Sequence, residues 1–163
     1  MGFSVMGLII VALILVPNLF IIILPPKNTP KEIKDACVLV TVIERLGQAG
    51  CFILPVFSRG WLEGRGIDVW LVLMAVCIAV YWALWIRYAA RRDFAMLFEP
   101  LMFIPVPMAV FPVLAFASAA VWARSPWLGI AAAALALGHI ANSLHTFKNL
   151  KHDIKISVGK EYK

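Results

Sequence analysis

The basic residues of this chain gather between long apolar stretches, and this placement constrains the fold more than any other feature. Clusters of Lys and Arg follow the first, third and last apolar stretches, over residues 27–34, 87–92 and 148–163. The other two connections carry only Arg59 with Arg65, and Arg124. Because short basic loops stay cytoplasmic during membrane insertion, the pattern predicts a polytopic membrane protein with its N-terminus outside and its C-terminus inside.

The composition agrees with this prediction. Of the 163 residues, 63% are hydrophobic and only 15% are charged, whereas about 25% is usual in soluble domains. A spanning helix needs about 20 mostly apolar residues. We therefore expect an all-α helical bundle that forms a single transmembrane domain over residues 1–163, with no separate soluble module.

The net charge of +6 does not indicate a nucleic-acid-binding protein, because the positive residues sit at the ends of apolar stretches rather than on a basic surface. At those positions they satisfy the insertion rule and meet anionic headgroups. The expected partners are membrane lipids, including anionic headgroups at the basic cytoplasmic tail, and no nucleic acid.

The apolar stretches predict five transmembrane helices, at about residues 2–24, 30–57, 67–90, 94–123 and 126–147, followed by a basic cytoplasmic tail over 148–163. The last helix is expected to continue through residues 150–156, where it is basic, weakly amphipathic and on the inner membrane surface. Thr29, Pro30 and Glu32 form a capping box that predicts the start of the second helix. Four tryptophans flank the two connections placed outside, as expected for an interfacial aromatic belt: Trp61, Trp70, Trp122 and Trp127.

The fourth stretch is too long for one spanning helix, at about 45 Å against a hydrocarbon core of about 30 Å. It also contains four prolines, Pro100, Pro105, Pro107 and Pro112. Each interior proline removes a backbone hydrogen bond and clashes with the preceding turn. We expect a short interfacial piece over residues 94–99, followed by a Pro-kinked fourth helix.

Polar residues interrupt four of the apolar stretches and are the candidate ligand-binding residues: Glu44, Arg45, Gln48, Tyr81, Trp85, Glu99, His139, Asn142 and Ser143. Counting from the basic ends places Glu44, Tyr81 and His139 about 14 Å from the cytoplasmic boundary. A charge at the bilayer centre costs about 3 kcal/mol on insertion scales, so Glu44 and Arg45 need partners. We expect His139, Asn142 and Tyr81 beside Glu44, and Glu99 beside Arg45, in one cavity in the cytoplasmic half of the bilayer.

Signatures of enzymes and metal sites are absent from the sequence. It contains no GxSxG, HExxH or Walker A motif. A glutamate with His139 or His145 alone offers too few ligands for a metal, so no metal is expected and no cofactor can be named. Cys37, Cys51 and Cys77 form no CxxC pair and are predicted to be inert.

Three functions remain open. The first is the binding or transport of a lipid-like or small amphipathic molecule through the inner-half polar pocket, because ionisable groups inside a membrane mark functional sites. The second is an intramembrane enzyme that uses Glu44 and His139 as an acid–base pair on such a molecule. The third is a non-catalytic subunit of a larger membrane complex. We expect the protein in the plasma membrane of a bacterium, and a homo-oligomer remains open.

Overall fold

The computed structural model describes residues 2–30, 37–62 and 64–161, with backbone alone for Trp61 and residues 152–161. Every regular element in the described residues is helical. The elements are α1 (Val5–Leu15), the 3₁₀ turn η1 (Val16–Leu19), α2 (Phe20–Ile23), α3 (Val38–Val56), α4 (Arg59–Leu62), α5 (Val69–Arg91), the 3₁₀ turn η2 (Phe94–Leu97), α6 (Pro107–Trp122), α7 (Pro126–Leu135), the π-helical turn η3 (Ala136–Ile140) and α8 (Ala141–Glu161).

Four helical stretches of the described chain are long and apolar enough to cross a membrane, namely Val5–Ile23, Val38–Val56, Val69–Arg91 and Pro126–Lys151. The remaining apolar helix, Pro107–Trp122, is shorter. Large apolar side chains on these helices face outward, as expected where the solvent is hydrocarbon rather than water. The protein is thus an all-helical bundle with the composition of a membrane protein.

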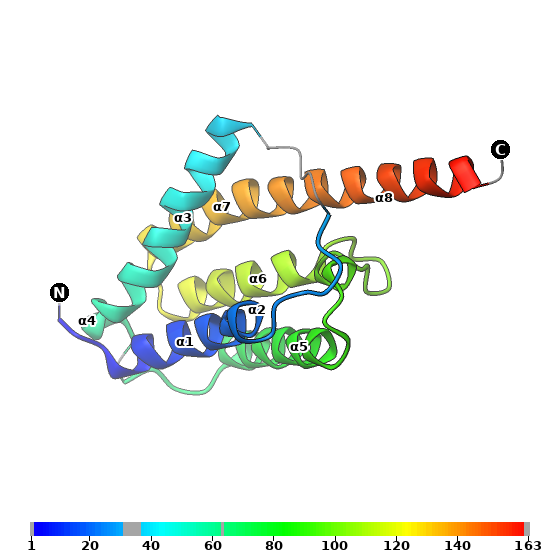
Figure 1. The fold of residues 1–163 in the computed structure, drawn as a ribbon. Coiled ribbons are helices and arrows are strands. Elements are labelled where there is room, and N and C mark those ends of the chain that lie inside the picture. The colour runs from blue at the N-terminus through cyan, green and yellow to red at the C-terminus, as the bar shows by residue number, and fades with distance from the viewer. Residues whose placement is uncertain (1, 31–36, 63, 162–163) are drawn as a thin grey trace.

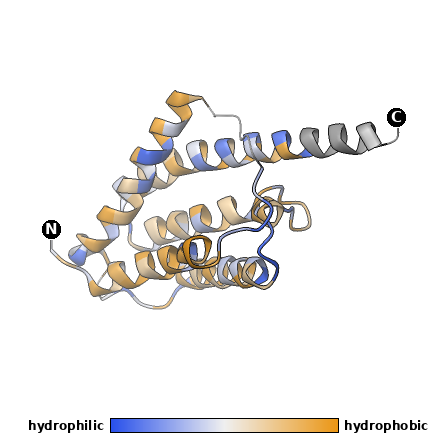
Figure 2. Ribbon diagram, in the orientation of Figure 1, coloured by the Kyte–Doolittle hydropathy of each residue, from blue (hydrophilic) through white to orange (hydrophobic). Residues whose placement is uncertain are grey.

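The long helices pack as a ring. Helix α5 lies against α6, α6 against α7, α7 against α3, and α3 against α1, while α1 and η1 contact α5. Helix α3 crosses its neighbours at a steep angle, and its N-terminal end points away from the other helices (Figure 1). The hydrophilic middle of α3 and the hydrophilic start of α8 stand out against the apolar colour of α1, α5 and α6 (Figure 2).

Glycines let the backbone of α3 touch its neighbours directly. A Cβ added at Gly47 would lie 2.8 Å from the Cα of Leu135 on α7, and one at Gly7 on α1 would lie 3.0 Å from the backbone nitrogen of Val56. Such contacts are the usual way in which membrane helices approach closely. They fix which face of α3 is turned toward α7.

The first span agrees with the predicted range of 2–24, although it is not a uniform α-helix. Pro17 lies in the 3₁₀ turn η1, which separates α1 from α2. Because proline cannot donate the backbone hydrogen bond of an α-helix, the first span changes from an α-helix to a 3₁₀ turn at Pro17.

The predicted start of the second helix is wrong. Thr29 and Pro30 are not helical, and α3 begins at Val38; Glu32 lies outside the described residues. Nearby, the backbone nitrogen of Lys27 donates to the carbonyl oxygen of Arg92 at 2.8 Å, which holds this connection against the end of α5. A capping residue contributes only about 1 kcal/mol, so such tertiary contacts can override it.

The fourth apolar stretch is interrupted, as predicted. A short 3₁₀ turn, η2, is followed by non-helical residues 98–106, and α6 begins with Pro107 in its first turn. Pro112 lies inside α6, which continues past it to Trp122. The break occurs where a proline suits a helix start, because its missing N–H would be unpaired there in any case.

The last helix continues beyond the end of its predicted span near Phe147. Helices α7 and α8 are joined by the π turn η3, and α8 runs on to Glu161. In Figure 1 α8 continues the direction of α7 and projects past the rest of the bundle. The predicted continuation over residues 150–156 is thus helical, and the helix extends to Glu161.

Candidate functional site

The candidate site forms where α3 crosses the π turn η3. A Cβ added at Gly138 would lie 2.5 Å from the Cα of Glu44 and 2.6 Å from its backbone nitrogen. Only a glycine allows this approach, because backbone atoms cannot rotate away as a side chain can. A π turn is rare and often accompanies a functional site. Here it lies in the last span at the level of Glu44.

Glu44, His139 and Asn142 form a hydrogen-bonded cluster at this crossing. The distance from His139 Nδ1 to Glu44 Oε1 is 2.6 Å, and Asn142 Nδ2 donates to Glu44 Oε2. With the carboxylate ionised, the proton of the first bond belongs to Nδ1, since a carboxylate only accepts. Both oxygens of Glu44 are therefore engaged, which meets the need of a charge held away from water.

Burial differs among the three side chains. That of Glu44 is 15% exposed, whereas that of His139 is 36% exposed. The Oδ1 atom of Asn142 is buried and accepts no hydrogen bond from the described part of the chain. The cluster thus has a covered carboxylate, an accessible imidazole and one unsatisfied acceptor.

Arg45 lies next to this cluster but is not part of it. Its side chain is exposed, and it donates to Gln48 Oε1 at 3.2 Å. Gln48 is about one turn farther from the Val38 end of α3, so this bond directs the guanidinium toward the middle of the helix rather than toward its N-terminal end. No carboxylate of the described residues forms an ion pair with Arg45.

The predicted pair of Arg45 with Glu99 is wrong. Glu99 lies after η2 and pairs with Arg87 near the end of α5, at 3.2 Å. Helix α3 packs on α7, η3 and α1, whereas Glu99 follows α5 and η2 in the chain and finds its partner on α5.

Tyr81 and Trp85 were also expected in the pocket, and this prediction is wrong as well. Both are buried on the face of α5 that meets the first span. Tyr81 donates its hydroxyl proton to Asn18 Oδ1 at 2.5 Å, and Tyr88 donates to the carbonyl oxygen of Leu24 at 2.8 Å. Trp85 packs edge-on against both tyrosines. These residues brace α5 against the first span.

The structure thus divides the nine candidates. It brings together Glu44, His139 and Asn142, with Arg45 and Gln48 alongside on α3 and Ser143, half-buried, following Asn142. It places Tyr81, Trp85 and Glu99 elsewhere. The described residues contain no group of three or more His, Cys, Asp or Glu side chains that could hold a metal ion.

Two features of the site were missed in the sequence. One is the π turn, which leaves no recognisable local signal. The other is the direct backbone contact of Gly138 with Glu44. Gly47 and Gly50 on α3 are one turn apart and could have indicated the face that meets the last span.

Comparisons of the chain with protein families, with curated proteins and with solved structures found no match.

Proposed function

We propose that this protein binds or transports a lipid-like or small amphipathic molecule with an anionic headgroup. The headgroup would lie against Arg45 and His139, where α3 crosses the last span, and the apolar part would lie along the outward faces of α3. From the charge pattern, this is the cytoplasmic half of the bilayer.

The observation that carries the proposal is the exposed guanidinium of Arg45 within an apolar helix. Its side-chain hydrogen bond goes to a neutral amide, Gln48 Oε1, and no carboxylate of the described residues lies within ion-pair distance of the guanidinium. A charge at such a depth costs about 3 kcal/mol. A phosphate or carboxylate from a bound amphiphile would form a direct ion pair with the guanidinium and accept bidentate hydrogen bonds from it.

The neighbouring cluster supports a binding role. Because Glu44 is covered and fully hydrogen-bonded, it serves to orient His139 through Nδ1. The other ring nitrogen, Nε2, has no hydrogen-bond partner in the described part of the chain, and the ring is 36% exposed. An imidazole held in this way can donate to, or accept from, a ligand headgroup.

The same arrangement favours one alternative. A carboxylate that fixes the tautomer of a histidine is the usual arrangement for a general base, so His139 Nε2 could exchange protons with a substrate in an intramembrane enzyme. In that case Glu44→Gln should abolish turnover while binding persists. Recovery of a defined protein partner with the purified chain would instead favour a subunit of a larger complex.

Photolabelling would test the proposal. The protein is placed in phosphatidylcholine nanodiscs with a trace of a single-chain alkyl phosphate that carries a diazirine, or with an uncharged amphiphile of the same chain length. Labelled peptides are then mapped. We expect the phosphate probe to label residues 38–56 and 136–143 about tenfold more than the uncharged probe, and Arg45→Gln to remove this preference.

Arg91→Gln is the matched control, because it removes an equal charge from an exposed position at the end of α5 and should leave the labelling of α3 unchanged. Equal labelling of α3 by the two probes, or an undiminished preference in Arg45→Gln, would overturn the proposal.

A further inference from the structure

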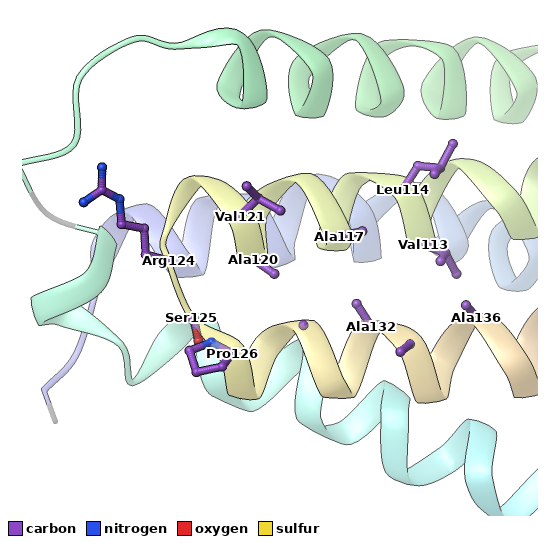
Figure 3. Close-up of a pocket in the computed structure, with 12 residues that line it drawn as sticks. Val113, Leu114, Ala117, Ala120, Val121, Arg124, Ser125, Pro126, Ala132 and Ala136 are labelled. Atoms are coloured by element: carbon purple, nitrogen blue, oxygen red, sulfur yellow. The ribbon is translucent and has the colours of Figure 1, made fainter.

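An open groove runs between α6 and α7, from the start of η3 to the connection between the two helices. It has a volume of about 670 Å³ and extends from Val113 and Ala136 to Arg124 (Figure 3). Its walls are mostly small side chains, including Ala117, Gly129 and Ala133. Two helices that face each other with so little side-chain volume leave space between them. Ligand pockets are commonly about 300–1,000 Å³, so the groove is large enough for part of a small molecule.

A second hollow adjoins the groove at the end formed by Arg124. It has a volume of about 410 Å³ and shares Val121 and Arg124 with the groove. Arg65, Trp70 and Trp122 also line it, together with Asp68, whose carboxylate accepts hydrogen bonds from the backbone nitrogens of Trp70 and Leu71. The apolar groove therefore leads into a polar hollow that two arginines and one aspartate line, with aromatic side chains in its walls. Tryptophans of this kind mark the membrane–water interface.

Arg124 occupies the junction between the two hollows. It lies in the turn between α6 and α7 with φ 51°, a left-handed conformation that favours glycine. Its side chain is exposed and extends past the end of the groove (Figure 3). Within the described part of the chain no hydrogen bond or ion pair engages its guanidinium. Arg65, beside it, donates to the carbonyl oxygen of Ala123 at 3.4 Å.

We infer that this groove binds an anionic phospholipid of the outer leaflet, with one acyl chain between α6 and α7 and its phosphate at Arg124. The apolar walls match the chain, and the exposed guanidinium of Arg124 at the end of the groove matches the charge of the phosphate. This site is separate from the one formed by Arg45 and His139, and it does not depend on the function proposed there.

The charge at the end of the groove argues against a helix from a second copy as the occupant. A helix is about 10 Å across with its side chains, and an apolar one would pass Arg124 without offering an acceptor. A phospholipid offers an acyl chain for the apolar groove and a phosphate for Arg124 at its end, in the same order along the surface.

Photolabelling of this site uses phosphatidylglycerol with a diazirine near the end of one acyl chain, compared with phosphatidylcholine that carries the same chain, in nanodiscs of unlabelled phosphatidylcholine. We expect phosphatidylglycerol to label residues 113–136 about tenfold more. Arg124→Gln should lower labelling to the level of phosphatidylcholine, and Arg124→Lys should retain most of it. Arg124→Gly should also lose the preference but melt no lower than the wild type, because glycine suits the left-handed φ.

Bulk placed in the groove gives a second test. Ala133→Trp should reduce labelling by phosphatidylglycerol, whereas Leu137→Trp, which introduces the same side chain at an exposed position of the next turn, should not. If Ala133→Trp fails to fold, the Arg124 variants decide the question.

Equal labelling by the two lipids, or labelling unchanged by Arg124→Gln, would overturn the inference. So would disulfide-linked dimers formed efficiently by Ala133→Cys, because a second copy would then occupy the groove. Labelling of α3 over 38–56 is scored separately, so failure of the inner site would not be mistaken for failure of this one.

Discussion

Gly138→Ala should disrupt the contact that forms the Glu44 cluster. The new methyl group would lie 2.5 Å from the Cα of Glu44 and 2.6 Å from its backbone nitrogen. Ordinary contacts are about 3.5 Å or longer, so α3 would have to move by about 1 Å. The same displacement would lengthen the bond of 2.6 Å between His139 and Glu44 to about 3.6 Å, beyond hydrogen-bonding distance.

The expected loss of stability follows from these two effects. Overpacking of a close contact costs about 1–3 kcal/mol, and loss of a hydrogen bond to a charged group costs about 1.5–3 kcal/mol. Together they predict that Gly138→Ala lowers the free energy of unfolding by about 3 kcal/mol or more. Denaturation of the purified protein in a mild detergent, followed through helix content, would measure this change.

Gly129→Ala provides the matched control, since it is the same substitution in the same span. Its new methyl group would approach no closer than 4.0 Å to the Cβ of Ala120, and alanine stabilises a helix by about 0.5–1 kcal/mol relative to glycine. This variant should be as stable as the wild type or more so. If Gly138→Ala proves equally stable, α3 does not approach η3 as closely as described, and the geometry of the site fails with it.

Two further predictions concern the rest of the bundle. Tyr81→Phe should lower the free energy of unfolding by about 1 kcal/mol, because the hydrogen bond to Asn18 is lost. It should leave unchanged the preference of α3 for labelling by the phosphate probe. Loss of that preference would show that Tyr81 contributes to the binding site after all. Single cysteines in residues 58–66, in a background without native cysteines, should react with an impermeant maleimide added to intact cells, whereas those in 148–163 should not. External labelling of the tail would reverse the orientation assumed for both binding sites.

Residues of similar depth show how far the sequence could predict the site. Glu44, Tyr81 and His139 were placed at about the same level, yet only Glu44 and His139 meet. The depth of a residue follows from counting along a helix. Which neighbouring helix its side chain faces depends on how the helices pack, and counting does not give this. Since α5 packs on α6 and the first span, Tyr81 meets Asn18 instead.

The sequence by itself determined the class of the protein, the approximate extent of its apolar helices and the interruption of the fourth stretch. These properties depend on local quantities: the length of apolar stretches, the missing donor of proline and the positions of Lys and Arg. The tertiary structure decided which helices are neighbours, where α3 begins, and which partner each polar residue finds. The approach of Gly138 to Glu44 joins residues far apart in the chain. Such contacts depend on the shape of two packed surfaces, which no local pattern encodes.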